Sequence, residues 1–264
     1  MIRVLAVVLL LSIAGLVSAE GRVSTQVQPM ASQEQVSALL DWLEVLTAAR
    51  QADRLISQSV ERQVDLSAEQ RSELRAALTA ATGSEAVAAS VQAYVAQHSH
   101  ADWDRALAIY QGSLARRARN FEAALGLSVA ADKFHQYQQR VAVSEQRRAL
   151  ARQLDALLHC SEIAVILQTE IDASTEMLSN NMQGGQYTQQ DREQLALHAQ
   201  QRRAHMATVA ENLFLYAYRF LKDDELQAFV EQLDDPSVRA ITDSALKAFV
   251  QVLKAGRAVA LTNN

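Results

Sequence analysis

Helix-breaking residues are scarce in this chain of 264 residues. Between Arg22 and Ala255 the only prolines are Pro29 and Pro236. The glycines of the same span are Gly83, Gly112, Gly126, Gly184 and Gly185. Residues that favour helices, above all alanine, leucine, glutamine, glutamate and arginine, dominate the rest. No stretch shows the strict alternation of apolar and polar residues that marks a half-buried strand. The sequence therefore predicts an all-α, multi-helix bundle.

The first residues have the pattern of a cleavable secretory signal. Arg3 supplies a positive charge, an apolar run extends from Val4 to Val17, and small residues follow at Ser18 and Ala19. The run is shorter than the roughly 20 apolar residues that a membrane-spanning helix needs. We therefore expect a signal peptide over residues 1–19, a flexible leader over residues 20–31, and a periplasmic protein without a stable transmembrane anchor after cleavage.

Charge and cysteine content exclude two further classes of protein. The formal net charge is −5, and loss of Arg3 with the signal makes it one unit more negative. Nucleic-acid binding normally needs a basic surface, so we expect no nucleic-acid partner. The single cysteine, Cys160, excludes an intramolecular disulfide framework. The fold must therefore be held by a packed core.

An apolar pattern near the C-terminus occurs twice in the sequence. The later copy has one apolar stripe at helical spacing, formed by Leu226, Phe229, Val230 and Leu233. The same offsets are occupied 123 residues earlier by Trp103, Ala106, Leu107 and Tyr110. Asp235-Pro236 follows the later stripe as a helix stop and a new helix start, and Gly112-Ser113 stands in its place in the earlier copy. The bundle is thus predicted to contain two tandem, diverged helical repeats.

The repeats divide the chain into three parts. We expect an N-terminal helical repeat over residues 32–127, a linking helix over 128–158 with a bend near Val143-Ser144, and a C-terminal helical repeat over 159–264. The arginines of the linking helix are predicted to form a solvated face: Arg140, Arg147, Arg148 and Arg152.

Local signals set several helix boundaries. Capping boxes at Ser32 and Ser67 each predict a helix start. The apolar spacing predicts one helix from Ser32 through Leu46 and a second from Ala48 to Gln63. The stretch 179–187, with paired asparagines and paired glycines, is predicted to be a loop.

The C-terminal pattern also carries a family resemblance. The tail Leu221-Lys222-Asp223-Asp224-Glu225-Leu226-Gln227-Ala228-Phe229, followed by Asp235-Pro236-Ser237-Val238-Arg239, resembles the bacterial exported family called domain of unknown function 2059. Residues 108–113 of the first half resemble a second, more diverged copy. The resemblance implies a small, all-helical periplasmic protein, and it supplies no activity and no catalytic residues.

Histidines and acids give the chain only weak candidates for a metal site. The densest set of possible ligands is His98, His100, Asp102 and Asp104. Asp102 fits the role of a helix cap, and two histidines at positions i and i+2 do not share a helix face. His198 and His205 lie two helical turns apart, about 10 Å by helical rise, which is too far for one ion. No metal site is predicted.

The sequence also offers little for catalysis. Cys160 lies between His159 and Glu162, but adjacent residues on a helix point about 100° apart, so Cys160 is predicted to be a buried structural residue. No phosphate-binding loop and no hydrolase motif occurs. The basic cluster Arg116, Arg117 and Arg119, beside Phe121, is interpreted as a solvated helix face. We therefore predict a non-enzymatic protein without a cofactor.

Three classes of function stay open at this point. The first is a protein-interaction or envelope-associated module whose partner is an unknown envelope protein or a second copy of the chain. The alternative is a carrier of a small apolar ligand or lipid in a helical groove. The third, a metal-dependent or thiol enzyme, requires the His98 group or Cys160 to meet residues from distant sequence. For the carrier, the predicted groove is lined by Phe214, Phe220, Phe229 and Phe249.

Overall fold

The computed structural model describes residues 32–123, 137 and 141–262. Within these ranges the chain consists of helices and their connections, with no strand, so the predicted all-α bundle is confirmed. The expected signal peptide and leader lie outside the described residues. The helices are α1 (Gln33–Trp42), α2 (Val45–Ala49), α3 (Ala52–Glu61), α4 (Ala68–Thr82), α5 (Ser84–His98), α6 (Trp103–Tyr110), α7 (Ser113–Ala123), α9 (Glu145–Leu158), α10 (Cys160–Met182), α11 (Gln189–Ala217), α12 (Asp223–Leu233) and α13 (Pro236–Thr262).

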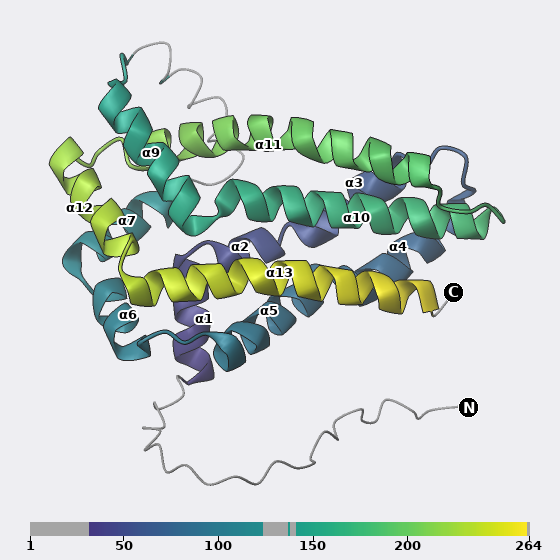
Figure 1. Cartoon of the computed structure of the whole chain (residues 1–264), viewed down its shortest axis with the longest axis horizontal. Coiled ribbons are helices and arrows are strands. Elements are labelled where there is room, and N and C mark those ends of the chain that lie inside the picture. The colour runs from purple at the N-terminus through teal and green to yellow at the C-terminus, as the bar shows by residue number, and fades with distance from the viewer. Residues whose placement is uncertain (1–31, 124–136, 138–140, 263–264) are drawn as a thin grey trace, which may run out of the picture.

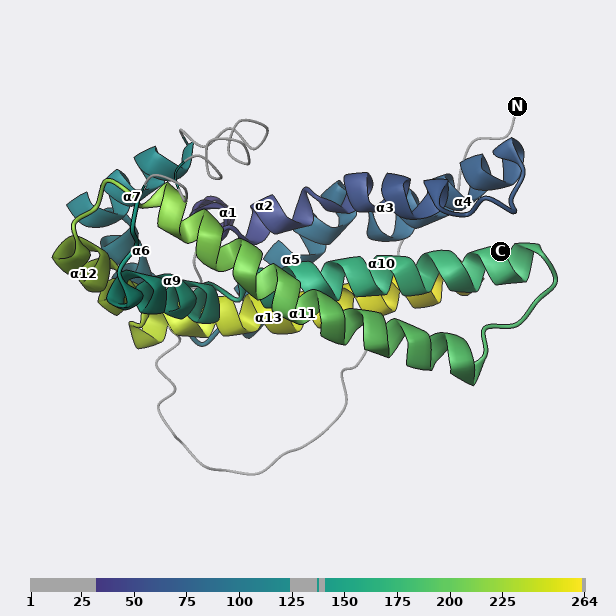
Figure 2. The same cartoon turned by 90° about the horizontal axis from the view of Figure 1, so that it is seen from above.

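The long helices α10, α11 and α13 lie side by side, and α1 to α5 lie behind them (Figure 1). Seen from above, the shorter helices α6, α7, α9 and α12 gather at one end of the molecule (Figure 2). Helix α13 packs against α4, α5 and α10, so the C-terminal helix lies against both halves of the chain. One continuous apolar core therefore includes residues of both halves, among them Leu39, Leu78, Leu167 and Phe249.

Helix starts were the features that the sequence predicted best. The Ser32 and Ser67 side chains accept hydrogen bonds from the backbone N–H groups of Gln35 and Gln70, and both capping boxes are complete. A third capping box, at Thr188, begins α11. These residues satisfy backbone donors that the first helical turn leaves unpaired.

Several boundaries differ from the prediction. The helix predicted from Ser32 through Leu46 is broken between Trp42 and Val45, and the helix predicted from Ala48 begins at Ala52.

Residues 141–144 are not helical, and α9 begins at Glu145 because the Ser144 hydroxyl accepts from the Arg147 N–H at 3.2 Å. The linking helix predicted over 128–158 is therefore interrupted, and the break includes the predicted bend at Val143-Ser144, while residues 128–136 and 138–140 lie outside the described residues. The loop predicted over 179–187 is also too long, because α10 continues to Met182.

Arg147 was predicted to face solvent and is buried instead. Its guanidinium donates to the carbonyl oxygens of Tyr218 at 2.6 Å and Leu221 at 3.0 Å, and it forms an ion pair with Asp223. The two carbonyls belong to the segment that follows α11, so Arg147 supplies donors where the helix leaves its own acceptors unpaired. This contact joins α9 to the turn between α11 and α12.

A buried carboxylate joins α3, α10 and α11. Asp172 on α10 has a side chain that is 7% exposed and accepts from Arg62, the residue that follows α3, at 2.6 Å. Its second oxygen accepts from Arg202 of α11 at 2.5 Å. Ser59 and Gln168 each add a hydrogen bond of 2.9 Å to the first oxygen. A buried charge needs such partners, and here they come from both sides of α10.

Gly256 lets α13 approach α4 closely. A Cβ atom at this position would lie 2.5 Å from Cγ2 of Thr82 and 2.7 Å from the carbonyl oxygen of Ala81. Both atoms belong to α4, which α13 contacts along its C-terminal part. Glycine is therefore required here for close helix packing and not for an unusual backbone angle.

The turn Asp235-Pro236 divides α12 from α13, as the sequence predicted. Asp235 accepts from the Ser237 N–H at 2.9 Å, and its other oxygen accepts from Arg105 of α6 at 2.6 Å. The hydrogen bond from Arg105 is the main reason that the pKa of Asp235 lies below its usual value. The earlier copy of this motif, around Gly112-Ser113, likewise divides α6 from α7. A common origin of the two halves stays a prediction.

Among the residues that the structure describes, no helix combines the length and the apolar character needed to cross a membrane.

We predict that Asp235→Ala lowers the free energy of unfolding by about 1–3 kcal/mol, because it removes both a helix cap and the partner of Arg105. The matched control is Asp234→Ala, which removes an exposed ion pair with Arg239 and should change stability little. Urea denaturation followed by circular dichroism measures both. A depressed pKa stabilises the fold above the unfolded pKa, so the effect of Asp235→Ala should shrink as the pH falls through the folded pKa. Equal effects of the two substitutions at neutral pH would contradict this role.

Asp172→Ala should cost about 3 kcal/mol, since it leaves Arg202 half-buried without its carboxylate. Glu61→Ala is the control, because Glu61 forms a 2.5 Å pair with Arg75 at the surface. The same denaturation experiment compares them. A loss for Asp172→Ala no larger than that for Glu61→Ala would show that the three-helix contact does not stabilise the fold.

Candidate functional site

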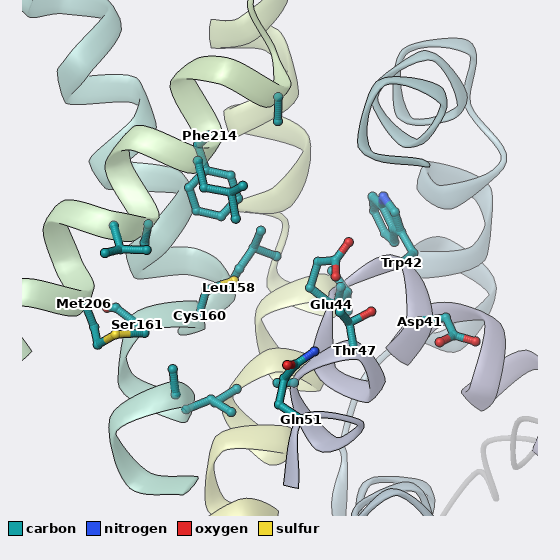
Figure 3. Close-up of a pocket in the computed structure, with 18 of the residues that line it drawn as sticks. Asp41, Trp42, Glu44, Thr47, Gln51, Leu158, Cys160, Ser161, Met206 and Phe214 are labelled. Carbon is teal, nitrogen blue, oxygen red and sulfur yellow. The ribbon is translucent and has the colours of Figure 1, made fainter. Parts of the chain in front are cut away.

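A cavity of about 960 Å³ lies between two walls of the bundle. One wall consists of the end of α1 with α2 and the start of α3. The other consists of the junction of α9 with α10 and the C-terminal half of α11. Figure 3 shows the two walls facing each other, with Glu44, Thr47 and Gln51 opposite Leu158, Cys160 and Phe214.

The wall formed by α10 and α11 is almost wholly apolar. Ile163 and Ala164 contribute from α10, and a stripe of α11 side chains runs along the cavity at helical spacing. The α11 residues of this wall are Met206, Val209, Ala210, Leu213, Phe214 and Ala217. Ser161 is the polar exception, and its hydroxyl donates to Asp155 at 2.6 Å. This wall can contact hydrocarbon but offers few hydrogen bonds.

The opposite wall carries the polar groups. Along α1 to α3 the polar residues that line the cavity recur every three or four positions: Asp41, Glu44, Thr47, Gln51 and Arg54. Such spacing puts side chains on one side of a helical segment. The cavity therefore has one apolar and one polar wall, as expected of a site for a molecule that is itself amphipathic.

Glu44 occupies the break between α1 and α2. Its φ angle is 60°, in the left-handed region that non-glycine residues rarely adopt. Burial raises the pKa of its carboxyl group above the usual value, and nearby Asp41 acts in the same direction. A hydrogen bond with Thr47 and the charge of Arg50 act against this shift. Glu44 is thus a desolvated carboxyl group that faces apolar side chains.

A second left-handed residue borders the same cavity. His159 has a φ angle of 54° and separates α9 from α10, while its neighbours Leu158 and Cys160 line the site. The ring of His159 lies 2.9 Å from Asp243 of α13. Both walls therefore change helix direction beside the cavity, and left-handed non-glycine backbone occurs at these two places among the described residues.

The cavity is bordered by exposed apolar side chains on one side. Val209 and Leu213 are 42% and 41% exposed, although both line the site. Phe214, one position farther along, is 5% exposed. The exposed pair marks the place where the apolar wall meets solvent.

Aromatic side chains form the end of the cavity nearest α6. The rings of Trp42 and Tyr110 lie 5.6 Å apart, and the guanidinium of Arg119 stands 3.8 Å above Tyr110. Arg119 also donates to the Tyr110 carbonyl at 3.1 Å, which satisfies an acceptor at the end of α6. Its charge is therefore already engaged within the fold.

The metal candidates of the sequence do not converge. Among the described residues no group of three or more histidine, cysteine or acidic side chains could hold an ion. The ring of His98 lies 2.9 Å from the Tyr94 carbonyl and stacks on the Tyr94 ring. Asp102 caps α6 through the Arg105 N–H, as predicted. The remaining metal candidates are all exposed: His100, Asp104, His198 and His205.

Cys160 differs from its prediction as a buried residue, because it is half-buried and lines the cavity. The basic cluster is solvated in part, as Arg116 and Arg117 are exposed and Arg119 is half-buried. Arg117 makes a two-pronged ion pair with Glu225 of α12 at 2.6 and 3.1 Å.

Of the four phenylalanines predicted to line a groove, only Phe214 lines this cavity. Phe229 and Phe249 are buried in the core, and Phe220 is 61% exposed. The α1–α2 residues of the site were missed entirely. The available signal was a single charge, Glu44, inside the otherwise apolar run from Trp42 to Leu46.

Comparison of the chain with family models, curated proteins and solved structures gives no significant match. The resemblance to the domain of unknown function 2059 family therefore stays a prediction.

The position of Cys160 generates a direct test of the cavity. We expect N-ethylmaleimide to add once to the folded protein, because the only thiol of the sequence is half-buried beside the open space. An apolar dye that fills the cavity should slow this addition, which intact-mass spectrometry follows over time. Addition that begins only in denaturant would contradict the accessibility of this wall.

Proposed function

We propose that this protein is a non-enzymatic carrier that holds a small apolar or amphipathic ligand between the α1–α3 wall and the α10–α11 wall. The observation that carries the proposal is the cavity with its apolar wall. Its volume, about 960 Å³, lies within the range of roughly 300–1,000 Å³ typical of small-molecule sites.

Water is a poor occupant for such a space. A water molecule needs two to four polar partners, and the α10–α11 wall offers few of them. Removing apolar surface from water contributes roughly 25 cal/mol for each Å² buried. A hydrocarbon ligand would therefore be bound mainly by contact with Met206, Leu213 and Phe214.

The walls are held in place without a ligand. Helices α3 and α11 are both tied to Asp172 on α10, and α9 is tied to the end of α11 by Arg147. A site whose walls are fixed before binding loses less entropy when the ligand enters. This supports a carrier over a surface that forms only with its partner.

The proposal includes export to the periplasm. Its support is the signal-like pattern of Arg3, the apolar run Val4 to Val17 and the small residues after it. A carrier of apolar molecules is useful in an aqueous compartment, where such molecules have low solubility.

A second candidate function is a protein-interaction module. Its support is the exposure of large apolar side chains on and after α11, with Leu197 54% exposed and Phe220 61% exposed. Native mass spectrometry of the purified protein separates the two functions. A bound small mass supports the carrier, and a doubled mass supports self-association.

The carrier proposal predicts that Ala164→Trp weakens binding of the dye 1-N-phenylnaphthylamine by about tenfold or more, because the indole fills space at the apolar wall. Fluorescence titration measures the affinity. The matched control is Ala207→Trp, at an exposed position of α11 outside the cavity lining, which should leave the affinity unchanged. Equal affinities of both variants and the unmodified protein would overturn the proposed site.

A further inference from the structure

We propose that the cavity selects amphiphiles that carry a positively charged amine, and that Glu44 is the residue that binds this amine. The inference rests on the proposed carrier function and names the chemical class of its ligand. It is argued from the carboxyl group of Glu44, which lies on the polar wall and faces the apolar wall.

Glu44 is placed to meet a ligand inside the cavity. Its side chain projects from the break between α1 and α2 toward the wall that holds Leu158 and Phe214 (Figure 3). The left-handed backbone at this residue is fixed by the two helices on either side of it. A charge held in one position before binding recognises its partner without further ordering.

Each of the other charged groups of the lining makes a contact within the protein, although only Asp41 has a partner of opposite charge. Asp41 pairs with Arg50 at 2.7 Å. Arg54 is exposed and donates to Gln51 at 3.1 Å. Arg119 is engaged by the carbonyl and the ring of Tyr110.

The Glu44 carboxyl group stands apart from these pairs. Among the described residues no ion pair is formed with Glu44, and the nearby Arg50 is paired with Asp41 instead. Of the two carboxyl groups in the lining, Glu44 is therefore the one left to face a ligand.

An ammonium group of a ligand would supply the partner of opposite charge that Glu44 does not have within the described residues. A carboxyl group among apolar side chains is costly when ionised and without a partner, and an opposite charge within hydrogen-bond distance offsets that cost. The hydrocarbon part of the same ligand would lie against the α10–α11 wall.

Ligands of the opposite or of no charge fit less well. A carboxylate next to Glu44 would face a like charge in a poorly solvated place. An alcohol could form one hydrogen bond but would leave the charge of Glu44 uncompensated. The expected order of affinity is amine, then alcohol, then carboxylate.

The test measures displacement of bound 1-N-phenylnaphthylamine from the full chain by three ligands of equal chain length: decylamine, decanol and decanoate. We expect decylamine to bind about tenfold more tightly than decanol, because its ammonium group adds an opposite charge to the hydrogen bond that either ligand can donate. In Glu44→Gln this preference should disappear while the affinity for decanol is kept. Gln keeps the length of the side chain and removes a desolvated charge, so this variant should fold.

Glu61→Gln is the matched control. It neutralises a carboxylate of α3 that lies outside the cavity lining and pairs with Arg75, and it should retain the preference for decylamine. Equal binding of the three ligands by the unmodified protein, or a preference for decanoate, would overturn the assignment of Glu44 while leaving the carrier function intact. Failure of the dye and of all three ligands to bind would refute the carrier function itself.

Discussion

The Asp172 carboxylate connects helices α3, α10 and α11 through ion pairs with Arg62 and Arg202. Arg62 reaches it from the end of α3 and Arg202 from α11, while Asp172 itself belongs to α10 between them. Each of these helices also packs on α10 through apolar side chains, but apolar contacts alone are not directional. The charge-assisted hydrogen bonds add direction, because their geometry is narrow. The walls of the cavity thus have a defined position on either side of α10.

Two interruptions of helical geometry give the cavity its shape. Straight helices packed side by side would fill the space between α2 and α11 with their own side chains. Instead, Glu44 and His159 each take a left-handed conformation, and the helices on either side change direction there. A left-handed conformation is unfavourable for residues with a Cβ atom, and it persists only where the surrounding structure holds the residue in place. Here the two sites border the same open space, which is the strongest reason to connect this strain with binding.

The sequence predicted the parts of the fold that depend on local chemistry. The caps at Ser32, Ser67 and Asp235 were found because a side chain and a backbone donor lie within three residues of each other. The apolar residues of α11 that line the cavity recur at helical spacing, but this spacing does not reveal that they line a cavity. Periodicity shows that a helix face avoids water and does not show whether another helix or an open space covers it.

The errors arose where distant residues decide the outcome. Arg147 looks like any surface arginine until Tyr218, Leu221 and Asp223 are brought to it by the fold. The break at Glu44 was hidden because the apolar spacing continues through it from Leu43 to Leu46. The sequence shows that Cys160 cannot form an intramolecular disulfide, but its place on the cavity wall depends on how α10 packs against α2.

The position of α13 has a consequence for how the chain reaches its native state. This helix packs on α4, α5 and α10, and Gly256 brings it against α4 with no room for a side chain between them. Its partners are therefore synthesised well before it is. Contacts between segments far apart in the sequence require closure of long loops and slow the folding of a domain. The apolar faces of α4 and α5 stay incompletely covered until residues 236–262 have been synthesised. During this time the chain can associate with other molecules before α13 docks.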